Sequence, residues 1–161
     1  MDKKTFIYQW LDQNHIPYQT REHPAVFTME ELSNLNLENP SAICKNLFLR
    51  DQKGKRHFLV MVDGEKRIDL KTLGEKTGHR LSFASEERLK KYLNLEKGSV
   101  TPLGIFFDEE KAVEVLCDSS LAEKPLIGVH PGENNATVFL SPRDLESLIK
   151  DHGNSFTWTD L

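Results

Sequence analysis

Three short segments of the chain carry polar or conformationally special residues inside otherwise apolar stretches. In the first, Lys45 and Asn46 interrupt the apolar run 42–50. An ammonium group is very costly to bury without a partner, so Lys45 must reach an anion, a cleft or solvent. A lysine in a functional site fits this pattern, and so does a lysine that extends to water from the edge of a strand.

The second segment is Gly-Ser-Val-Thr-Pro-Leu-Gly at 98–104, and the third is Ile-Gly-Val-His-Pro-Gly-Glu-Asn-Asn at 127–135. Glycine and proline in the second predict a stiff, tightly turned loop whose backbone N–H groups can point toward a ligand oxygen. In the third, His130 ends an apolar run and precedes a turn, which favours a place at the edge of a site. A plain connecting turn and a structural histidine are the alternatives for these two segments.

Together, the three segments resemble the YbaK/ProRS-associated editing domains, a family that deacylates mischarged tRNA. The lysine of the family corresponds to Lys45, its GxxxP loop to residues 98–102 and its late histidine to His130. GxxxP alone is a weak signal, but the three motifs in this order and at these separations are specific, and the resemblance covers nearly the full chain. The segment Glu-His-Pro-Ala-Val-Phe-Thr at 22–28 also resembles the free-standing Ala-tRNA(Pro) deacylases of this family.

The resemblance implies that water hydrolyses an aminoacyl ester, with help from the neighbouring ribose hydroxyl of the terminal adenosine. Lys45 would hold the phosphate and ribose of the substrate and stabilise the negative charge that develops. His130 would position the substrate at the edge of the pocket. Within the second segment, the backbone of four residues would polarise the carbonyl or place the water: Gly98, Ser99, Val100 and Thr101.

Further residues are expected to contact the substrate: Asn46, Pro102 and Gly128, together with Val26, Phe27 and Met29. Asn46 would reach it only if the strand is bulged there, because on a regular strand it faces away from Lys45. The last three are chosen as an apolar size filter that admits alanine and rejects proline; core packing is the alternative for them. A second, editing site is needed because one methylene changes binding by only about 1–3 kcal/mol.

The substrate that the resemblance implies is Ala-tRNA(Pro), which the chain would deacylate in trans as a proofreading enzyme. The same hydrolysis of Cys-tRNA(Pro) or Ser-tRNA is an alternative. A non-catalytic tRNA- or synthetase-binding module is another, although such a module would be free to lose Lys45 and the GxxxP loop. A generic small-molecule hydrolase is disfavoured because no activated nucleophile stands out. The expected partners are the tRNA acceptor end and, transiently, prolyl-tRNA synthetase or an elongation factor.

Composition narrows the class of protein. The 161 residues carry a net charge of −4, with 38% hydrophobic and 29% charged residues, which fits one soluble domain and argues against a protein that coats DNA or other nucleic acid. No apolar run approaches the roughly 20 residues of a membrane helix, so we expect no membrane contact and a cytoplasmic location. Cys44 and Cys117 form no CxxC motif, the histidines form no metal-binding pair and no nucleotide-binding motif occurs, so we expect no metal and no cofactor.

Short elements must position these residues. Apolar periodicity and capping residues predict helices at 2–14, 28–35, 69–76, 85–93 and 141–151. Apolar runs predict strands at 18–22, 42–50, 57–62, 80–83, 103–107, 112–117, 126–129 and 136–140. Helices interleaved with hairpins predict a single α+β domain over residues 1–161. As in the editing domains, we expect a mixed, mostly antiparallel and partly barrel-like sheet flanked by short helices.

Overall fold

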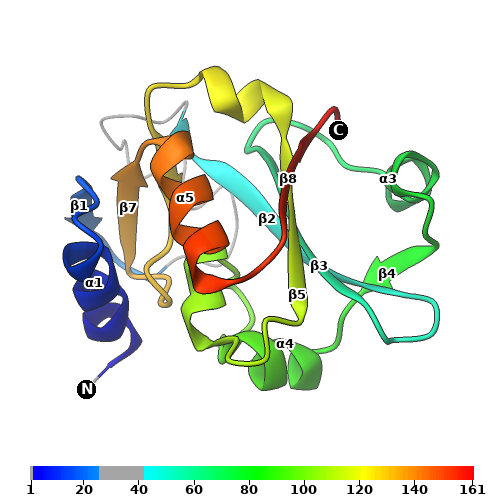
Figure 1. The fold of residues 1–161 in the computed structure, drawn as a ribbon, viewed down its shortest axis with the longest axis horizontal. Coiled ribbons are helices and arrows are strands. Elements are labelled where there is room, and N and C mark those ends of the chain that lie inside the picture. The colour runs from blue at the N-terminus through cyan, green and yellow to red at the C-terminus, as the bar shows by residue number, and fades with distance from the viewer. Residues whose placement is uncertain (1, 26–41) are drawn as a thin grey trace.

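In the computed structural model, which describes residues 2–25 and 42–161, the strands form two sheets around a shared core (Figure 1). The five-stranded sheet has the order β4 (Leu81–Phe83), β2 (Cys44–Asp51), β3 (His57–Asp63), β5 (Val113–Asp118) and β8 (Phe156–Thr159). The three-stranded sheet has the order β1 (Gln19–Glu22), β7 (Ala136–Leu140) and β6 (Ile127–Val129). The pairs β3–β5 and β5–β8 are parallel and the other four ladders are antiparallel.

Strands β2 and β3 form a hairpin in the middle of the larger sheet. Its register is regular from Cys44 opposite Asp63 to Arg50 opposite His57, with no extra residue in either strand. The polar turn that joins the strands is closed by bonds from Gly54 N–H to the Asp51 carbonyl and from Lys55 N–H to the Asp51 carboxylate. Regular pairing makes successive side chains of β2 alternate between the two faces of the sheet.

The helices begin at the capping side chains that the sequence indicates. Asp2 caps α1 (Lys3–Gln13), Asp69 caps α3 (Leu70–Thr77), Ser85 caps α4 (Glu86–Leu93) and Ser141 caps α5 (Pro142–His152). Each of these side chains accepts a backbone N–H of the first turn, which satisfies a donor that has no partner within the helix. Helix α3 ends at Gly78, whose φ of +78° lies in the left-handed region that favours glycine.

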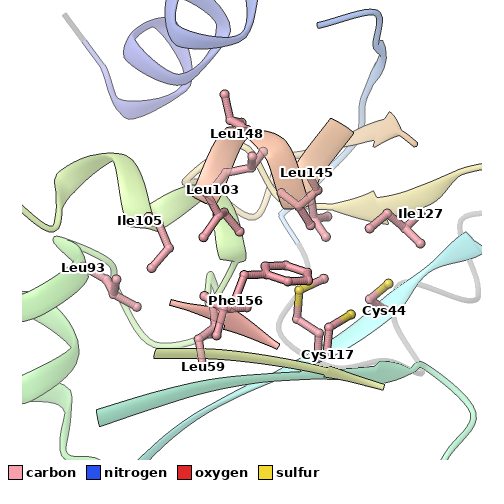
Figure 2. Packing of buried hydrophobic residues seen from close by; sticks show 14 of the residues in the cluster. Cys44, Leu59, Leu93, Leu103, Ile105, Cys117, Ile127, Leu145, Leu148 and Phe156 are labelled. Atoms are coloured by element: carbon pink, nitrogen blue, oxygen red, sulfur yellow. The ribbon is translucent and has the colours of Figure 1, made fainter. Parts of the chain in front are cut away.

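The main core lies on one face of the five-stranded sheet, beneath α1, α5 and the 3₁₀ helix η2 (Pro102–Phe107) (Figure 2). Residues of α5 and η2 point onto strands β3, β5 and β8, with Leu103, Leu145, Leu59, Cys117 and Phe156 among the contacts. A smaller cluster covers the other face and includes Leu49, Phe58, Val60, Leu73 and Leu81. A second 3₁₀ helix, η3 (Ser119–Glu123), follows β5.

The α+β prediction is confirmed, and most predicted elements lie within a few residues of the observed ones. The strand predicted at 103–107 is wrong: this segment is η2, which Thr101 caps and Pro102 begins. Strand β8 was not predicted. The helix predicted at 28–35 lies outside the described residues. Within the described ranges the two sheets do not close into a barrel, so the partly barrel-like sheet becomes two sheets joined at one edge.

Candidate functional site

The two sheets meet where the beginning of β2 approaches β6. Ile43 and Gly128 form a parallel β-bridge. A Cβ at position 128 would lie 2.9 Å from Ile43 Cδ1 and 2.9 Å from Phe139 Cε1, so any larger residue there would force these side chains to shift, and glycine suits the close approach of the sheets. Lys45 and His130 each lie two residues beyond this bridge, in the same direction. Because side chains alternate along strands, both belong to the outer face that Ile43 and Gly128 share, opposite the main core.

Lys45 places a positive charge on this face. Its side chain is half-buried, and its ammonium donates to the main-chain carbonyl of Lys66, with an N···O distance of 2.9 Å. Among the residues that the structure describes, no carboxylate pairs with Lys45. A neutral carbonyl orients the ammonium but cancels none of its charge, so Lys45 remains able to bind an anion.

Asn46 lies on the opposite face of β2 from Lys45. The regular register leaves no bulge, and the expectation for a regular strand therefore applies. The Asn46 Oδ1 atom is buried and accepts no hydrogen bond from the described part of the chain. A direct contact between the Asn46 side chain and a ligand held by Lys45 is not supported by this geometry.

The segment 98–102 is a tight loop that is fastened to the histidine segment. Gly98 has a φ of +87°, and Ser99 N–H donates to the Glu96 carbonyl at 3.1 Å. The Thr101 hydroxyl donates to the main-chain carbonyl of His130 at 2.5 Å and accepts Leu103 N–H at 3.3 Å. One buried side chain therefore caps η2 and joins two motifs that lie 29 residues apart in the sequence.

The same loop presents backbone donors. In the described part of the chain, the N–H groups of Val100 and Thr101 have no hydrogen-bond acceptor. Such groups can donate to an oxygen that gains negative charge. Ser99 is buried and lines a groove of about 550 Å³ beside the N-terminus of α1, and Pro102 is buried as the first residue of η2.

His130 is held as a neutral ring. Burial lowers its pKa, a hydrogen bond to the Ala136 carbonyl acts in the opposite direction and the nearby His23 lowers it further. The Nδ1 atom lies 3.0 Å from the Ala136 carbonyl, so Nδ1 carries the proton and Nε2 is left as an acceptor. The ring centroids of His23 and His130 are 6.5 Å apart, and His23 also contacts the Thr137 hydroxyl at 2.9 Å.

His23 was not among the sequence candidates. Its only sequence signal is its place in the segment 22–28, which resembles one branch of the editing domains. The size-filter candidates Val26, Phe27 and Met29 lie outside the described residues.

The cysteines do not supply a nucleophile. Both are free and buried, and burial raises the pKa of Cys44 to about 12 and that of Cys117 still further above its ordinary value. Both thiols are therefore protonated near neutral pH and unreactive.

In residues 2–25 and 42–161, no group of three or more His, Cys, Asp or Glu side chains is arranged to hold a metal ion. Nor does any helix in these ranges have the length and apolar character needed to cross a membrane.

Comparisons with known proteins point to one family. The model of the aminoacyl-tRNA editing domain matches residues 23–148. The chain is 48% identical to the prolyl-tRNA editing protein ProX of Acetoanaerobium sticklandii, with 100% of this chain and 99% of that protein covered. It is 37% identical to prolyl-tRNA synthetase associated domain-containing protein 1 of Mus musculus, with 83% of this chain and 81% of that protein covered. A crystal structure assigned to a trans-editing enzyme for prolyl-tRNA synthetase has the same fold, with a TM-score of 0.74 and 22% identity over 100% of this chain and 98% of that one.

Proposed function

The chain belongs to the aminoacyl-tRNA editing domain family, and on that premise we propose that it hydrolyses the ester bond of mischarged tRNA(Pro) in trans, with Ala-tRNA(Pro) as its substrate. The full-length likeness to a prolyl-tRNA editing protein supports tRNA(Pro) as the carrier. The reaction is proofreading: a correctly charged tRNA is left intact, and the wrong amino acid is released.

One observation supports this function above the others. The Ile43–Gly128 bridge and the Thr101–His130 hydrogen bond gather three distant segments, each with a different chemical group. Lys45 offers a positive charge, the 98–101 loop offers backbone N–H groups that have no acceptor among the described residues, and His130 offers an unprotonated ring nitrogen. A binding module would need the charge, but it would have no use for backbone donors to an oxyanion.

In the proposed mechanism, the side chains orient and stabilise while water attacks. Lys45 binds the phosphate and ribose of the terminal adenosine and stabilises the negative charge of the tetrahedral intermediate. The backbone N–H of Val100, which is partly exposed, hydrogen-bonds the carbonyl oxygen as it becomes negatively charged, and the buried Thr101 holds this loop in place. The adjacent ribose hydroxyl orients the attacking water, and His130 Nε2 accepts a hydrogen bond from substrate or water at the edge of the site. No covalent intermediate is required, which agrees with the protonated, buried state of both cysteines.

Discrimination between alanine and proline requires a pocket that is too small for proline. Exclusion by volume is effective here because the rejected residue is the larger one, the reverse of the problem that the synthetase faces. Val26, Phe27 and Met29 remain our candidates for this filter.

The partner that this function requires is the acceptor end of tRNA. A net charge of −4 limits non-specific attraction to the phosphate backbone, so binding should be weak and sensitive to salt. We further propose that the protein works in the cytoplasm and contacts prolyl-tRNA synthetase or an elongation factor only transiently.

The test is the rate of deacylation for a panel of mischarged tRNAs, with Ala-, Cys- and Ser-tRNA beside correctly charged Pro-tRNA(Pro). We expect wild-type protein to release alanine from Ala-tRNA(Pro) and to spare Pro-tRNA(Pro). We expect Lys45→Ala to abolish this activity with an unchanged circular dichroism spectrum, and His130→Ala to weaken it less. Faster hydrolysis of Cys- or Ser-tRNA would change the substrate, and full activity of Lys45→Ala would refute the mechanism.

A further inference from the structure

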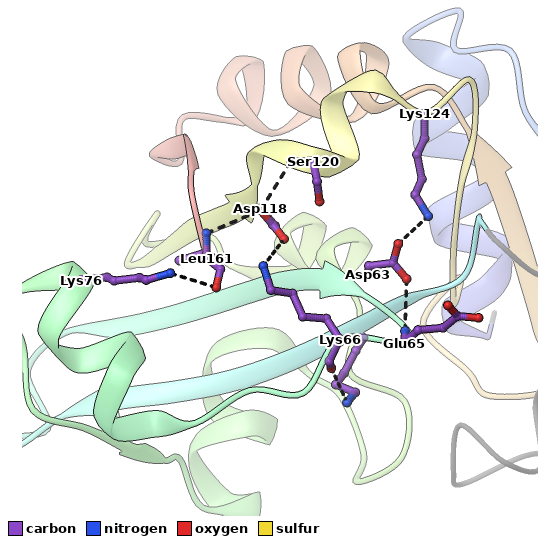
Figure 3. A network of polar contacts seen from close by, with 9 residues as sticks. Asp63, Glu65, Lys66, Lys76, Asp118, Ser120, Lys124 and Leu161 are labelled. Atoms are coloured by element: carbon purple, nitrogen blue, oxygen red, sulfur yellow. Dashed lines mark hydrogen bonds and ion pairs between the residues drawn. The ribbon is translucent and has the colours of Figure 1, made fainter.

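The residue whose carbonyl accepts the Lys45 ammonium, Lys66, forms an ion pair of its own with the buried carboxylate of Asp118. Lys66 Nζ lies 3.0 Å from Asp118 Oδ2, and the Asp118 side chain is only 2% exposed (Figure 3). Asp118 also accepts Ser120 N–H at 3.4 Å and Leu161 N–H at 3.5 Å. Lys66 therefore contacts two elements at once: its carbonyl accepts the Lys45 ammonium and its own ammonium is fixed to the end of β5.

The turn that carries Lys66 is bonded at its other end as well. Asp63, the last residue of β3, pairs with Lys124 at 2.8 Å and accepts Glu65 N–H at 3.1 Å. Lys66 N–H donates to the Asp63 carbonyl at 3.0 Å, and Gly64 N–H donates to the Ile43 carbonyl at 3.0 Å. The orientation of the Lys66 carbonyl is thus set by bonds on both sides of the turn.

This arrangement also separates the charges around Lys45. The nearby carboxylates of Asp63 and Asp118 are each engaged by a different lysine, Lys124 and Lys66. A free carboxylate next to Lys45 would form an ion pair with it and compete with a phosphate for the same ammonium. The carbonyl instead restricts a flexible side chain, whose ordering would otherwise cost conformational entropy when substrate binds.

We propose that Asp118 and Lys66 are positioning residues for deacylation: their ion pair holds the Lys66 carbonyl, which in turn holds the Lys45 ammonium at the place where it meets the substrate. This inference rests on the proposed function, because it assigns to the pair a role that is exerted through Lys45. It makes the pair part of the site although neither side chain contacts the substrate.

The experiment compares Asp118→Asn, Lys66→Ala and the double variant in deacylation of Ala-tRNA(Pro). Asp118→Asn keeps the shape of the side chain but removes its charge, and Lys66→Ala keeps the main-chain carbonyl but removes the tether. Each should lower kcat/KM by roughly 10- to 100-fold, since misplacement by about 1 Å has effects of this size. The kcat/KM of the double variant should be no lower than that of the less active single variant, because the two substitutions break the same ion pair.

Glu114→Gln is the matched control. Glu114 lies near the other end of β5 and pairs with Arg56 at 2.6 Å, so the substitution breaks an ion pair on the same strand far from Lys45. We expect Glu114→Gln to change kcat/KM by less than twofold. Asp118→Asn leaves no buried charge without a partner, so it should remain folded even if Lys66→Ala, which leaves the buried Asp118 carboxylate unpaired, is destabilised.

A second readout distinguishes positioning from general weakening of the fold. For binding of uncharged tRNA(Pro), Lys45→Ala should reduce the slope of log K against log salt by about 0.7, the value for one lost phosphate contact on a single strand. Lys66→Ala should reduce the slope to a similar extent, and Glu114→Gln should not. A variant that is only less stable would keep the wild-type slope.

The possible results separate the two claims. Wild-type protein that fails to deacylate any member of the panel refutes the proposed function itself. Active wild-type protein with full activity and an unchanged salt slope in Lys66→Ala overturns the positioning role and leaves the function standing. Additive losses in the double variant would also contradict it, because they would show that Asp118 and Lys66 act independently.

Discussion

Replacement of Thr101 by valine tests whether the loop and the histidine work as one unit. Thr101 is 0% exposed, and its hydroxyl is the donor to the His130 carbonyl and the acceptor for Leu103 N–H. Valine has nearly the same shape but no hydroxyl, so both groups lose their partner. A buried polar group left unsatisfied costs about 1–3 kcal/mol, so for the two groups together we expect the free energy of unfolding to fall by about 2–6 kcal/mol. For a chain of this size, each kcal/mol lowers Tm by roughly 2–4 °C.

The effect on activity should exceed the effect on stability. Without the hydroxyl, nothing in the described part of the chain fastens the Val100 N–H donor to the His130 segment. We expect kcat/KM for Ala-tRNA(Pro) to fall by about 10-fold or more at a temperature where the variant is fully folded. Thr101→Ser retains the hydroxyl and serves as the control, with most of the activity preserved. Urea titration and single-turnover deacylation give the two quantities, and a variant that loses stability but keeps wild-type kcat/KM would refute the coupling.

Two further perturbations test other parts of the structure. Gly128→Ala places a Cβ 2.9 Å from both Ile43 and Phe139, so we expect lower stability in thermal unfolding and reduced deacylation as the sheets move apart. Burial and, second, the charge of Arg88 lower the pKa of His57, and burial also lowers the pKa of His130. As the pH falls, these histidines therefore take up protons near pH 6.5 in the unfolded chain, and only at lower pH in the folded chain. The stability from these histidines is therefore present above about pH 6.5 and is lost as pH falls below it. Urea unfolding should give a smaller free energy at pH 5.5 than at 7.5, and His57→Gln should reduce the difference; equal stability at both pH values would contradict the burial argument.

Local signals in the sequence predict most of the fold because local interactions determine the ends of its elements. Asp69, Ser85 and Ser141 cap their helices through bonds to residues two or three places along the chain. The polar turn after residue 50 joins two strands that pair with their sequence neighbours. Each of these contacts lies within a few residues, where sequence patterns carry information.

The errors arise where distant contacts decide the structure. The apolar run 103–107 has the composition of a strand, yet Thr101 and Pro102 provide a capping side chain and a helical first residue, and these two residues determine the structure. The missed strand β8 has only four residues and pairs in parallel with β5, about forty positions earlier in the chain. So short a segment has little periodicity of its own.

The candidate site also has parts that the sequence predicts and parts that it does not. The motifs that contain Lys45, residues 98–102 and His130 can be recognised in the sequence, and their order indicates that they meet. Their supports cannot be recognised, because the partner of Lys45 is a main-chain carbonyl 21 residues away and that of Lys66 is a carboxylate 52 residues away. Every residue has a main-chain carbonyl, so no pattern of side chains predicts which carbonyl accepts the Lys45 ammonium.

A chain with a net negative charge can bind an RNA substrate because its lysines have different partners. Ion pairs with Asp or Glu engage seven of the described lysines, which are Lys3, Lys4, Lys66, Lys90, Lys97, Lys124 and Lys150. Lys45 is held by a neutral carbonyl instead, on the face that it shares with His130. An acidic protein that attracts the phosphate backbone weakly overall can still bind one phosphate at a defined point, provided that the cation there is oriented but not neutralised. For an editing enzyme this is an advantage, because low general affinity allows release of the many correctly charged tRNAs, and the local charge acts only when the acceptor end has entered the site.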